Sequence, residues 1–179
     1  MFLLNFEDLV TVWLISTGIF PERLKFSIIK PLFKKGDRAI PSNYRPISLL
    51  TAFSKVIGKA LYNRLIDHLN INSLLNPQQF GFRRNLSTEN AIFNLTHETL
   101  KALNNEMIVG SIFLDLEKAF DSINHSLLIN KLPYYGITGK SKLLIESYLA
   151  NRFQRVQLDN LLLDTKLDSM WMKVKRAVP

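Results

Sequence analysis

The stretch MIVGSIFLDL, residues 107–116, constrains the fold of this chain more than any other. It is apolar apart from one serine and carries no charge before Asp115. A continuous apolar run of this length is typical of a strand that is buried on both faces. We therefore expect a central strand here, with the carboxylate of Asp115 at the edge of a sheet and facing a cleft.

Other segments also have strand-like patterns. Residues 24–33 and 43–50 are predicted to pair as a hairpin, and residues 34–42 form its basic, turn-rich loop. A second hairpin is predicted over residues 153–164, with its turn at Asp159–Asn160. A last strand is expected over residues 171–179.

Apolar periodicity predicts helices in the rest of the chain. The N-terminal segment is expected to form a helix that ends at Gly18 and Pro21, and Ser87 is the expected N-cap of another helix. The remaining predicted helices cover residues 50–69, 88–103, 121–131 and 140–149. The helix over 88–103 is expected to turn Ile92, Leu95, Thr99, Leu100 and Leu103 inward. The fold class is therefore α+β.

Composition and charge limit the possible functions. Of the 179 residues 47% are hydrophobic, and 23 Lys+Arg against 15 Asp+Glu give a formal net charge of +8. This balance favours a polyanionic partner, although a solvated basic surface is the alternative. The lack of cysteine excludes disulfides, thiolate zinc sites and a cysteine nucleophile. Glu7 and Asp8 interrupt the apolar N-terminus, so we expect no membrane-spanning helix, and without a basic n-region or a clear small-residue cleavage site we expect no signal peptide.

Two acids frame the stretch that follows the apolar run. Asp115 ends the expected strand, and its hard oxygen ligands suit Mg²⁺, which usually takes one or two carboxylates with phosphates and water. Asp121 lies where a helix is expected to begin, and Asp is a favoured N-cap. From spacing alone, the simpler interpretation is a solvated acid at 115, a core aromatic at Phe120 and a helix cap at 121.

The first predicted hairpin concentrates positive charge. Between Pro21 and Arg45 there are only two acids, Glu22 and Asp37. The same stretch holds seven basic residues: Arg23, Lys25, Lys30, Lys34, Lys35, Arg38 and Arg45. On a hairpin several of them could converge on one phosphate group. A solvated hairpin tip is the alternative.

Three stretches together resemble a known family. They are TGIFPERLKFSIIKPLFKKGDRAIPSNYRPISLL, QFGFRRNLSTENAI and FLDLEKAFDSINHSLLINKLPYYGI. In this order and with these short intervals they resemble the reverse transcriptase domain of non-LTR retrotransposons, in particular jockey-like mobile elements. The resemblance extends from about Leu9 to Pro179.

The resemblance implies a right-hand polymerase of which this chain holds only the fingers and the N-terminal part of the palm. Residues 1–24 would be a helical lead-in, residues 25–106 the fingers region and residues 107–179 a partial palm. The implied activity is RNA-directed DNA synthesis, in which a deoxynucleoside triphosphate is added to a primer 3′-hydroxyl with two Mg²⁺ ions. The implied partners are an RNA template, a DNA primer and deoxynucleotides, and action at nuclear DNA is expected for such an element.

The resemblance also implies roles for single residues. Asp115 matches the first catalytic, metal-binding aspartate, and Phe120 matches the aromatic gate that excludes a 2′-hydroxyl. Arg45 matches the arginine that contacts the incoming triphosphate, and its companion lysine would be Lys30, Lys34 or Lys35. Nucleic acid would be contacted by Arg38, Phe80, Gly81, Phe82 and Arg83. In that set Gly81 would permit a positive φ or a close approach of the template, and the two phenylalanines would stack or pack.

The sequence departs from the family in two respects. The family takes its other two metal-binding acids from an aromatic-x-Asp-Asp hairpin, and this sequence contains no Asp-Asp pair. Its last residues, WMKVKRAVP, resemble the approach to a Pro-Gln-Gly-Ser turn, with Ala177 where Gly is usual. We therefore expect a fragment that is inactive alone. The alternative is a non-catalytic remnant that acts as a nucleic-acid-binding or structural module.

Overall fold

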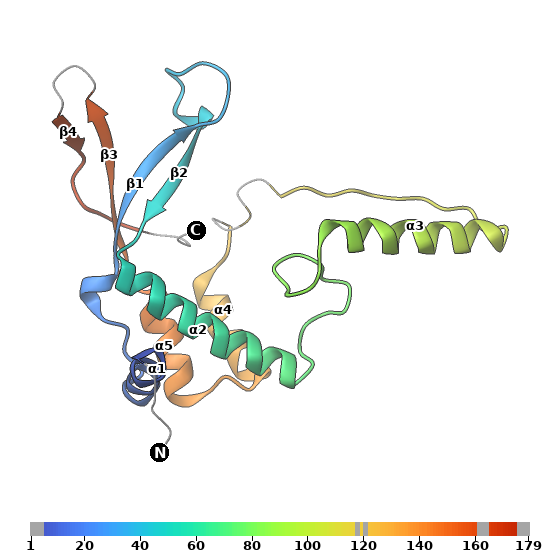
Figure 1. Ribbon diagram of the computed structural model, residues 1–179, viewed down its shortest axis with the longest axis horizontal. Coiled ribbons are helices and arrows are strands. Elements are labelled where there is room, and N and C mark those ends of the chain that lie inside the picture. Colours follow the sequence, from blue (N-terminus) through green and yellow to red (C-terminus); the bar gives the residue numbers. More distant parts are fainter. Residues whose placement is uncertain (1–5, 117–118, 120–121, 161–164, 175–179) are drawn as a thin grey trace. The chain divides into compact units, whose positions relative to one another are not determined.

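The computed structural model describes residues 6–116, 119, 122–160 and 165–174, and their elements are drawn in Figure 1. The chain divides into two compact units. The first combines Met1–Ile66 with Lys118–Pro179, and the second is Asp67–Glu117. The first unit contains helices and a mixed sheet, which confirms the predicted α+β class.

The sheet of the first unit consists of two hairpins joined at their base. Strands β1 (Phe26–Phe33) and β2 (Tyr44–Leu49) pair antiparallel, as do β3 (Phe153–Asn160) and β4 (Thr165–Asp168). The hairpins meet where β1 and β3 run parallel, and the strand order is β2-β1-β3-β4. The short strand β5 (Met172–Lys173) pairs with the beginning of β3. The structure therefore confirms the first predicted hairpin, and Figure 1 shows both hairpins extending from the base that they share.

Helices pack at the base of this sheet. They are α1 (Phe6–Thr17), α2 (Ala52–Ile71), α4 (His125–Lys131) and α5 (Gly139–Leu149), together with the 3₁₀ turns η1 (Glu22–Leu24) and η3 (Leu132–Tyr135), whereas the 3₁₀ turn η2 (Pro41–Asn43) lies between β1 and β2 at the other end of the sheet. Their core contains Leu14, Phe20, Ile57 and Leu144. Gly18 ends α1 as predicted. Its φ is 70°, and a Cβ there would lie 3.2 Å from the carbonyl oxygen of Lys140, so only glycine fits without strain.

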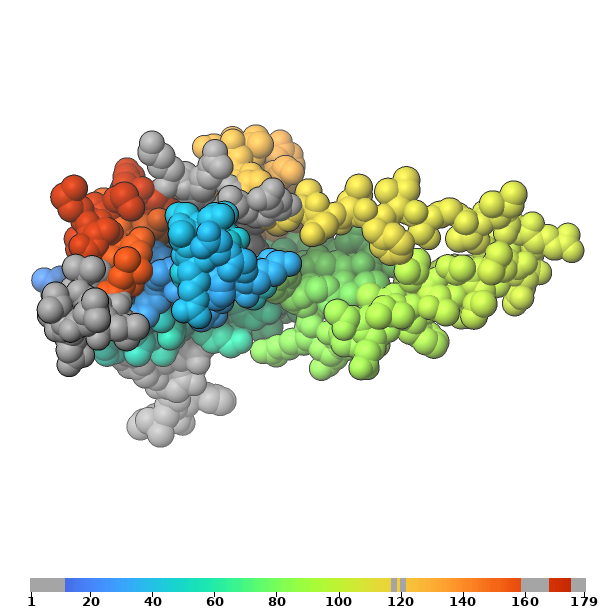
Figure 2. Space-filling view, turned by 90° about the horizontal axis from the view of Figure 1, so that it is seen from above, coloured from blue at the N-terminus to red at the C-terminus, as the bar shows by residue number. Residues whose placement is uncertain are grey.

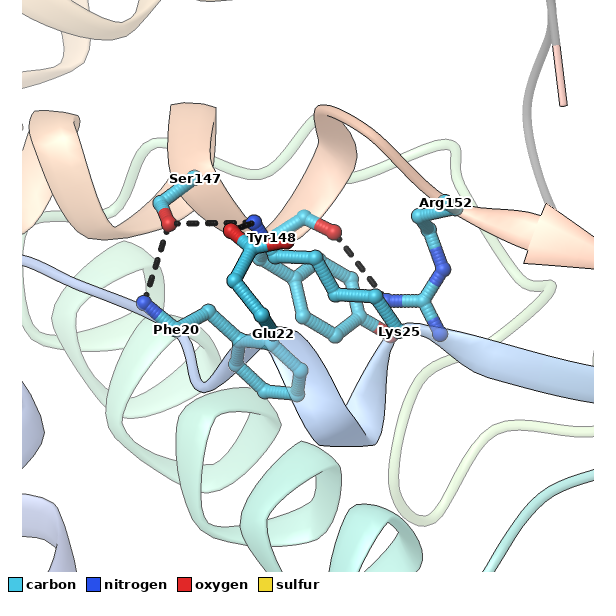
Figure 3. Close-up of polar contacts among 6 residues, drawn as sticks. All are labelled: Phe20, Glu22, Lys25, Ser147, Tyr148 and Arg152. Atoms are coloured by element: carbon cyan, nitrogen blue, oxygen red, sulfur yellow. Dashed lines mark hydrogen bonds and ion pairs between the residues drawn. The ribbon is translucent and has the colours of Figure 1, made fainter. Parts of the chain in front are cut away.

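Two cations lie inside this core region, as Figure 3 shows. Lys25 is 2% exposed, and its Nζ lies 2.7 Å from Oε1 of Glu22 and 3.5 Å from Oγ of Ser147. Arg152 is 4% exposed, donates to the carbonyl oxygen of Tyr148 at 3.1 Å and lies over that ring. Burial lowers the pKa of Arg152, and the charge interaction with Tyr148 opposes this shift. Lys25 thus joins the segment before β1 to α5 through Ser147, and Arg152 caps the end of α5 through the carbonyl oxygen of Tyr148.

The second unit contains one complete helix, α3 (Thr88–Asn104). Ser87 caps it as predicted: its Oγ accepts from the backbone N–H of Asn90, whose side chain in turn accepts from the N–H of Ser87. The predicted burial of its apolar face is wrong. Ile92, Leu95, Leu100 and Leu103 are 64%, 48%, 55% and 54% exposed. An amphipathic helix buries a face only against a second element, and the described residues of this unit provide no sheet to cover it.

The structure also contradicts the central strand predicted over residues 107–116. Residues 107–116 have no regular secondary structure, and Ile108, Ile112, Phe113 and Leu114 are 101%, 88%, 81% and 89% exposed. A strand that is buried on both faces needs neighbours that pair with its backbone and layers that cover its side chains. No described strand pairs with this segment. The apolar run is therefore extended and exposed.

Three boundaries differ from the prediction. Asp159 and Asn160 do not form a turn, because they pair with Lys166 and Thr165, and the connection lies at residues 161–164, outside the described residues. The helix expected from residue 121 begins at His125, where Oδ1 of Asn124 accepts from a backbone N–H. The last strand is limited to β5 in the described part of the chain.

None of the helices that the structure describes is long and apolar enough to cross a membrane.

Candidate functional site

Two predicted nucleotide-binding cations share a face of the β1–β2 hairpin. Lys30 is directly opposite Ile47, and Leu32 is directly opposite Arg45. Residues that face each other across an antiparallel pair lie on one side of it, as do residues two apart on a strand. Lys30 and Arg45 are therefore diagonal neighbours, roughly 7–8 Å apart in such a ladder. Two long basic side chains at this spacing can reach adjacent phosphates.

The loop at the tip of the hairpin presents three more cations. Lys34, Lys35 and Arg38 are all exposed. The guanidinium carbon of Arg38 lies 5.2 Å from the centre of the Phe33 ring, within the range of a cation–π contact. In the view from above in Figure 2, this blue-to-cyan tip is not covered by other described segments of the first unit. The tip can therefore meet a large polyanion.

One member of the predicted basic group does not belong to this surface. Lys25 is buried and paired with Glu22, so it cannot contribute to an anion site on the hairpin. The alternation along β1 is the signal that could have shown this. Lys25, Ser27 and Ile29 occupy alternate positions and are all buried, whereas Lys30 is only half-buried.

The predicted template segment, residues 79–83, lies in the second unit as a loop. Gly81 does not have a positive φ; Phe82 does, at 58°. Open space surrounds Gly81, with no atom within 4 Å of a Cβ built there, so the expected close approach of a template stays a prediction. Phe82 is 82% exposed and not a core residue, while Phe80 is half-buried.

Arg83 takes part in the folding of this same loop. Its Nη1 donates to the carbonyl oxygen of Asn76 at 3.1 Å. The loop is also tied to α3, because Nδ2 of Asn94 donates to Oε1 of Gln78 at 3.1 Å. The guanidinium of Arg83 therefore already closes the loop, and its predicted contact with a phosphate is untested.

Asp115, the predicted catalytic acid, lies in the exposed segment 107–116 of the second unit. Its carboxylate is accessible to solvent and therefore to a metal ion. Across the described ranges, no group of three or more His, Cys, Asp and Glu residues could hold a metal ion. Phe120 and Asp121, the predicted gate and cap, lie outside the described residues.

Two residues that the sequence analysis did not single out organise the tip of the hairpin. The side chain of Asn43 donates to the carbonyl oxygen of Asp37 at 2.8 Å. The hydroxyl of Tyr44 donates to the carbonyl oxygen of Arg38 at 2.9 Å. Asn is a common turn residue because its amide can bond to nearby backbone, and its place at the end of this loop was the available signal.

Comparison with known proteins places this chain in a family. Residues 33–167 match the model of the reverse transcriptase (RNA-dependent DNA polymerase) family. The chain is 33% identical over 154 residues to a probable RNA-directed DNA polymerase from transposon BS of Drosophila melanogaster, with 82% of this chain and 16% of the relative covered. It is 28% identical over 157 residues to the RNA-directed DNA polymerase from mobile element jockey of the same species, with 87% and 17% covered.

A third relative is the probable RNA-directed DNA polymerase from transposon X-element of Drosophila melanogaster, 32% identical over 140 residues, which cover 74% of this chain and 15% of the relative. The chain thus spans about one sixth of the length of the relatives it matches. Because the family model matches most of the chain, the chain belongs to the reverse transcriptase family and is related to the polymerases of jockey-like non-LTR transposons.

Proposed function

We propose that this chain contributes the fingers and the beginning of the palm to an RNA-directed DNA polymerase of a mobile element. Such an enzyme adds deoxynucleotides to the 3′-hydroxyl of a DNA primer on an RNA template. The observation that carries the proposal is the family match over residues 33–167, because both Arg45 and Asp115 lie within it. The relatives carry this activity in their names.

Arg45 and Lys30 are proposed to bind the triphosphate of the incoming nucleotide. Their support is the shared face of the hairpin, where they are diagonal neighbours. Arg45 supplies a forked donor and Lys30 a point charge, a combination suited to neighbouring phosphates. Of the three candidate lysines, Lys30 is preferred on this ground. Lys34, Lys35 and Arg38 are assigned to nucleic acid, because they lie in the exposed loop at the tip.

Asp115 is proposed as a ligand of Mg²⁺. The donor fits, because Mg²⁺ accepts a hard carboxylate oxygen together with water and substrate phosphates, and the carboxylate is exposed. Bound there, Mg²⁺ would neutralise charge on the triphosphate. A pair of such ions would need more acidic ligands than Asp115, because among the described residues no group of three or more His, Cys, Asp and Glu could hold a metal ion. The chain's own contribution is to hold one carboxylate and to position phosphates through the hairpin.

The proposal is tested by titrating the 179-residue chain against a short fluorescein-labelled single-stranded RNA at several salt concentrations. With roughly 4–6 phosphates engaged, each contributing about −0.7 on a single strand, the slope of log affinity against log salt is expected to be about −3 to −4. Lys34→Ala is expected to weaken binding and to reduce the magnitude of the slope by about one.

The matched control is Lys101→Ala, which removes an exposed lysine from α3 and should leave both affinity and slope unchanged. Displacement of a labelled dATP analogue provides the second arm: Arg45→Ala should weaken triphosphate binding more than RNA binding. Binding that does not respond to salt, or equal effects of Lys34→Ala and Lys101→Ala, would refute the assignment of the hairpin.

A further inference from the structure

One asparagine connects the two ends of the loop between β1 and β2. The backbone N–H of Lys34 donates to the carbonyl oxygen of Asn43 at 2.9 Å, next to the end of β1. Nδ2 of Asn43 donates to the carbonyl oxygen of Asp37 at 2.8 Å, inside the loop. The N–H of Asn43 donates to the carbonyl oxygen of Ile40 at 3.0 Å. A single residue thus contacts the loop at three points.

The path of the loop also depends on Gly36. Its φ is 93°, a conformation that other residues rarely adopt, and a Cβ there would lie only 2.7 Å from Nδ2 of Asn43. The amide of Asn43 therefore fills the space that a side chain at position 36 would need. The two residues fit together, and a change at one alters what the other tolerates.

Arg38 is held at two points of the same loop. Its carbonyl oxygen accepts from the hydroxyl of Tyr44 at 2.9 Å, and its guanidinium lies 5.2 Å from the centre of the Phe33 ring. The rings of Phe33 and Tyr44 in turn meet edge to face at 5.4 Å. Oδ1 of Asp37 accepts from the N–H of Ala39 at 2.9 Å, which shapes the adjoining turn.

These contacts lie at an exposed tip and not in the core. Lys34, Lys35, Gly36 and Arg38 are exposed, and the core cluster of this unit is formed by helices at the other end of the sheet. A network here adds little to the burial of apolar surface. What it does provide is one defined shape for a loop that carries three cations.

We infer that Asn43 is a positioning residue, which holds the loop 34–42 in one shape so that Lys34, Lys35 and Arg38 meet the phosphates of nucleic acid without first being ordered. This inference rests on the proposed function of the hairpin. A loop that is already in its bound shape avoids the entropic cost of ordering when the ligand arrives. Loosening the loop should therefore weaken binding although every charge is still present.

Affinity and its salt dependence, measured together, distinguish the loss of loop positioning from the loss of a phosphate contact. A variant that removes a phosphate contact releases fewer counterions and lowers the magnitude of the salt slope. Asn43→Ala removes no charge, so it should lower the affinity at every salt concentration and leave the slope unchanged. The expected loss is about three- to tenfold, the equivalent of the one neutral side-chain hydrogen bond to the carbonyl oxygen of Asp37 that this substitution removes.

The experiment measures binding of the labelled single-stranded RNA by the 179-residue chain, its Asn43→Ala variant and the matched control Asn70→Ala, which removes an exposed asparagine from α2. Hydrogen exchange over residues 34–43 is measured on the same samples. We expect faster exchange in this segment and weaker binding for Asn43→Ala only, with an unchanged melting temperature.

A double-mutant cycle with Gly36→Ala provides the second test. Gly36→Ala alone should weaken binding, because its methyl group meets the Asn43 amide. In the Gly36→Ala/Asn43→Ala chain that clash is absent, so the combined loss should be smaller than the sum of the two single losses. Additive losses, unchanged exchange or unchanged affinity in Asn43→Ala would overturn the inference. If Lys34→Ala binds normally as well, the proposed function of the hairpin fails too; if only Lys34→Ala is weakened, the hairpin binds RNA without this positioning.

Discussion

At the scale of single residues, Lys25 and Arg152 show how position in the fold changes what a cation does. Both are ordinary basic residues in the sequence, yet they are 2% and 4% exposed. Lys25 is compensated by the carboxylate of Glu22, and Arg152 by a backbone carbonyl and by aromatic rings. A buried charge is tolerated only with such partners, because its removal from water is costly.

This environment predicts an unequal response to two substitutions. Glu22→Gln leaves the buried ammonium of Lys25 without its opposite charge and should lower the free energy of unfolding by about 1–3 kcal/mol. Lys25→Met keeps the aliphatic stem and removes the ammonium, so it should cost less or be neutral. Urea denaturation followed by circular dichroism measures both.

The control is Glu98→Gln, which neutralises an exposed acid on α3 and should leave the stability of the first unit unchanged. If Lys25→Met proves more destabilising than Glu22→Gln, the ammonium stabilises the fold through contacts other than the ion pair, such as the one with Oγ of Ser147, and the cost of its burial has been overestimated.

At the scale of elements, the contrast between β1 and residues 107–116 shows that pairing decides whether an apolar segment becomes a strand. β1 has neighbours on both edges, β2 and β3. Residues 107–116 are more apolar, but no described strand pairs with them and their side chains are exposed. An exposed apolar segment with unpaired backbone groups is a template for association with other chains.

We therefore expect the chain to self-associate through residues 107–116 and Phe113→Lys to reduce this association. Phe113 is 81% exposed, and a lysine there adds a charge that opposes strand pairing between copies. Sedimentation velocity over a concentration series measures the effect.

The matched control is Ile71→Lys, which changes an apolar residue that is 82% exposed at the end of α2 and not in an extended segment. Equal effects of the two substitutions would mean that general solubility, and not strand pairing, governs association.

At the scale of the whole molecule, the proposed polymerase chemistry needs several acids around its metal ions, and the described residues contain no group of three or more His, Cys, Asp and Glu residues that could hold one. The basic hairpin belongs to the first unit and Asp115 to the second. Proximity and orientation of reacting groups are worth up to roughly 7–11 kcal/mol in well-oriented systems. At about 1.4 kcal/mol per tenfold in rate, a site that lacks them falls below ordinary detection.

The 179-residue chain is accordingly expected not to extend a DNA primer on an RNA template with Mg²⁺ and four deoxynucleotides. A chimera in which it replaces its counterpart in the jockey polymerase of Drosophila melanogaster should extend the primer. Asp115→Asn in that chimera should reduce extension by about a thousandfold or more, because a charged metal ligand is lost.

Asp67→Asn in the same chimera, which neutralises an exposed acid of α2, should leave extension intact. Extension by the short chain that disappears with Asp115→Asn would show that its own residues complete the site. An inactive chimera with normal RNA binding would instead favour a non-catalytic remnant.

Local signals in the sequence predicted local structure well. Ser87, Gly18 and the turn-rich loop 34–42 each act within a few residues, so their effects on a helix start, a helix end and a hairpin could be anticipated. The turn at Asp159–Asn160 was misplaced, because the pairing of β3 with β4 carries the strand past residues that favour turns. Among the basic residues of the candidate site, Arg45, Lys30, Lys34 and Lys35 lie on the hairpin as predicted. Lys25 was also expected there, but it precedes β1 and is buried.

The sequence by itself determined the family, the order of helices and strands in the first unit and the positive charge of the hairpin, because each of these depends on residue type and short spacing. Only the tertiary structure decided that Lys30 and Arg45 share a face, that Lys25 and Arg152 are buried, and that Asn43 holds the loop. The shared face depends on strand register, the burial of the two cations on packing between segments distant in the chain, and the role of Asn43 on a side-chain contact inside the folded loop. The exposure of residues 107–116 has the same origin, since an apolar run becomes a buried strand only where other segments pair with it and cover it.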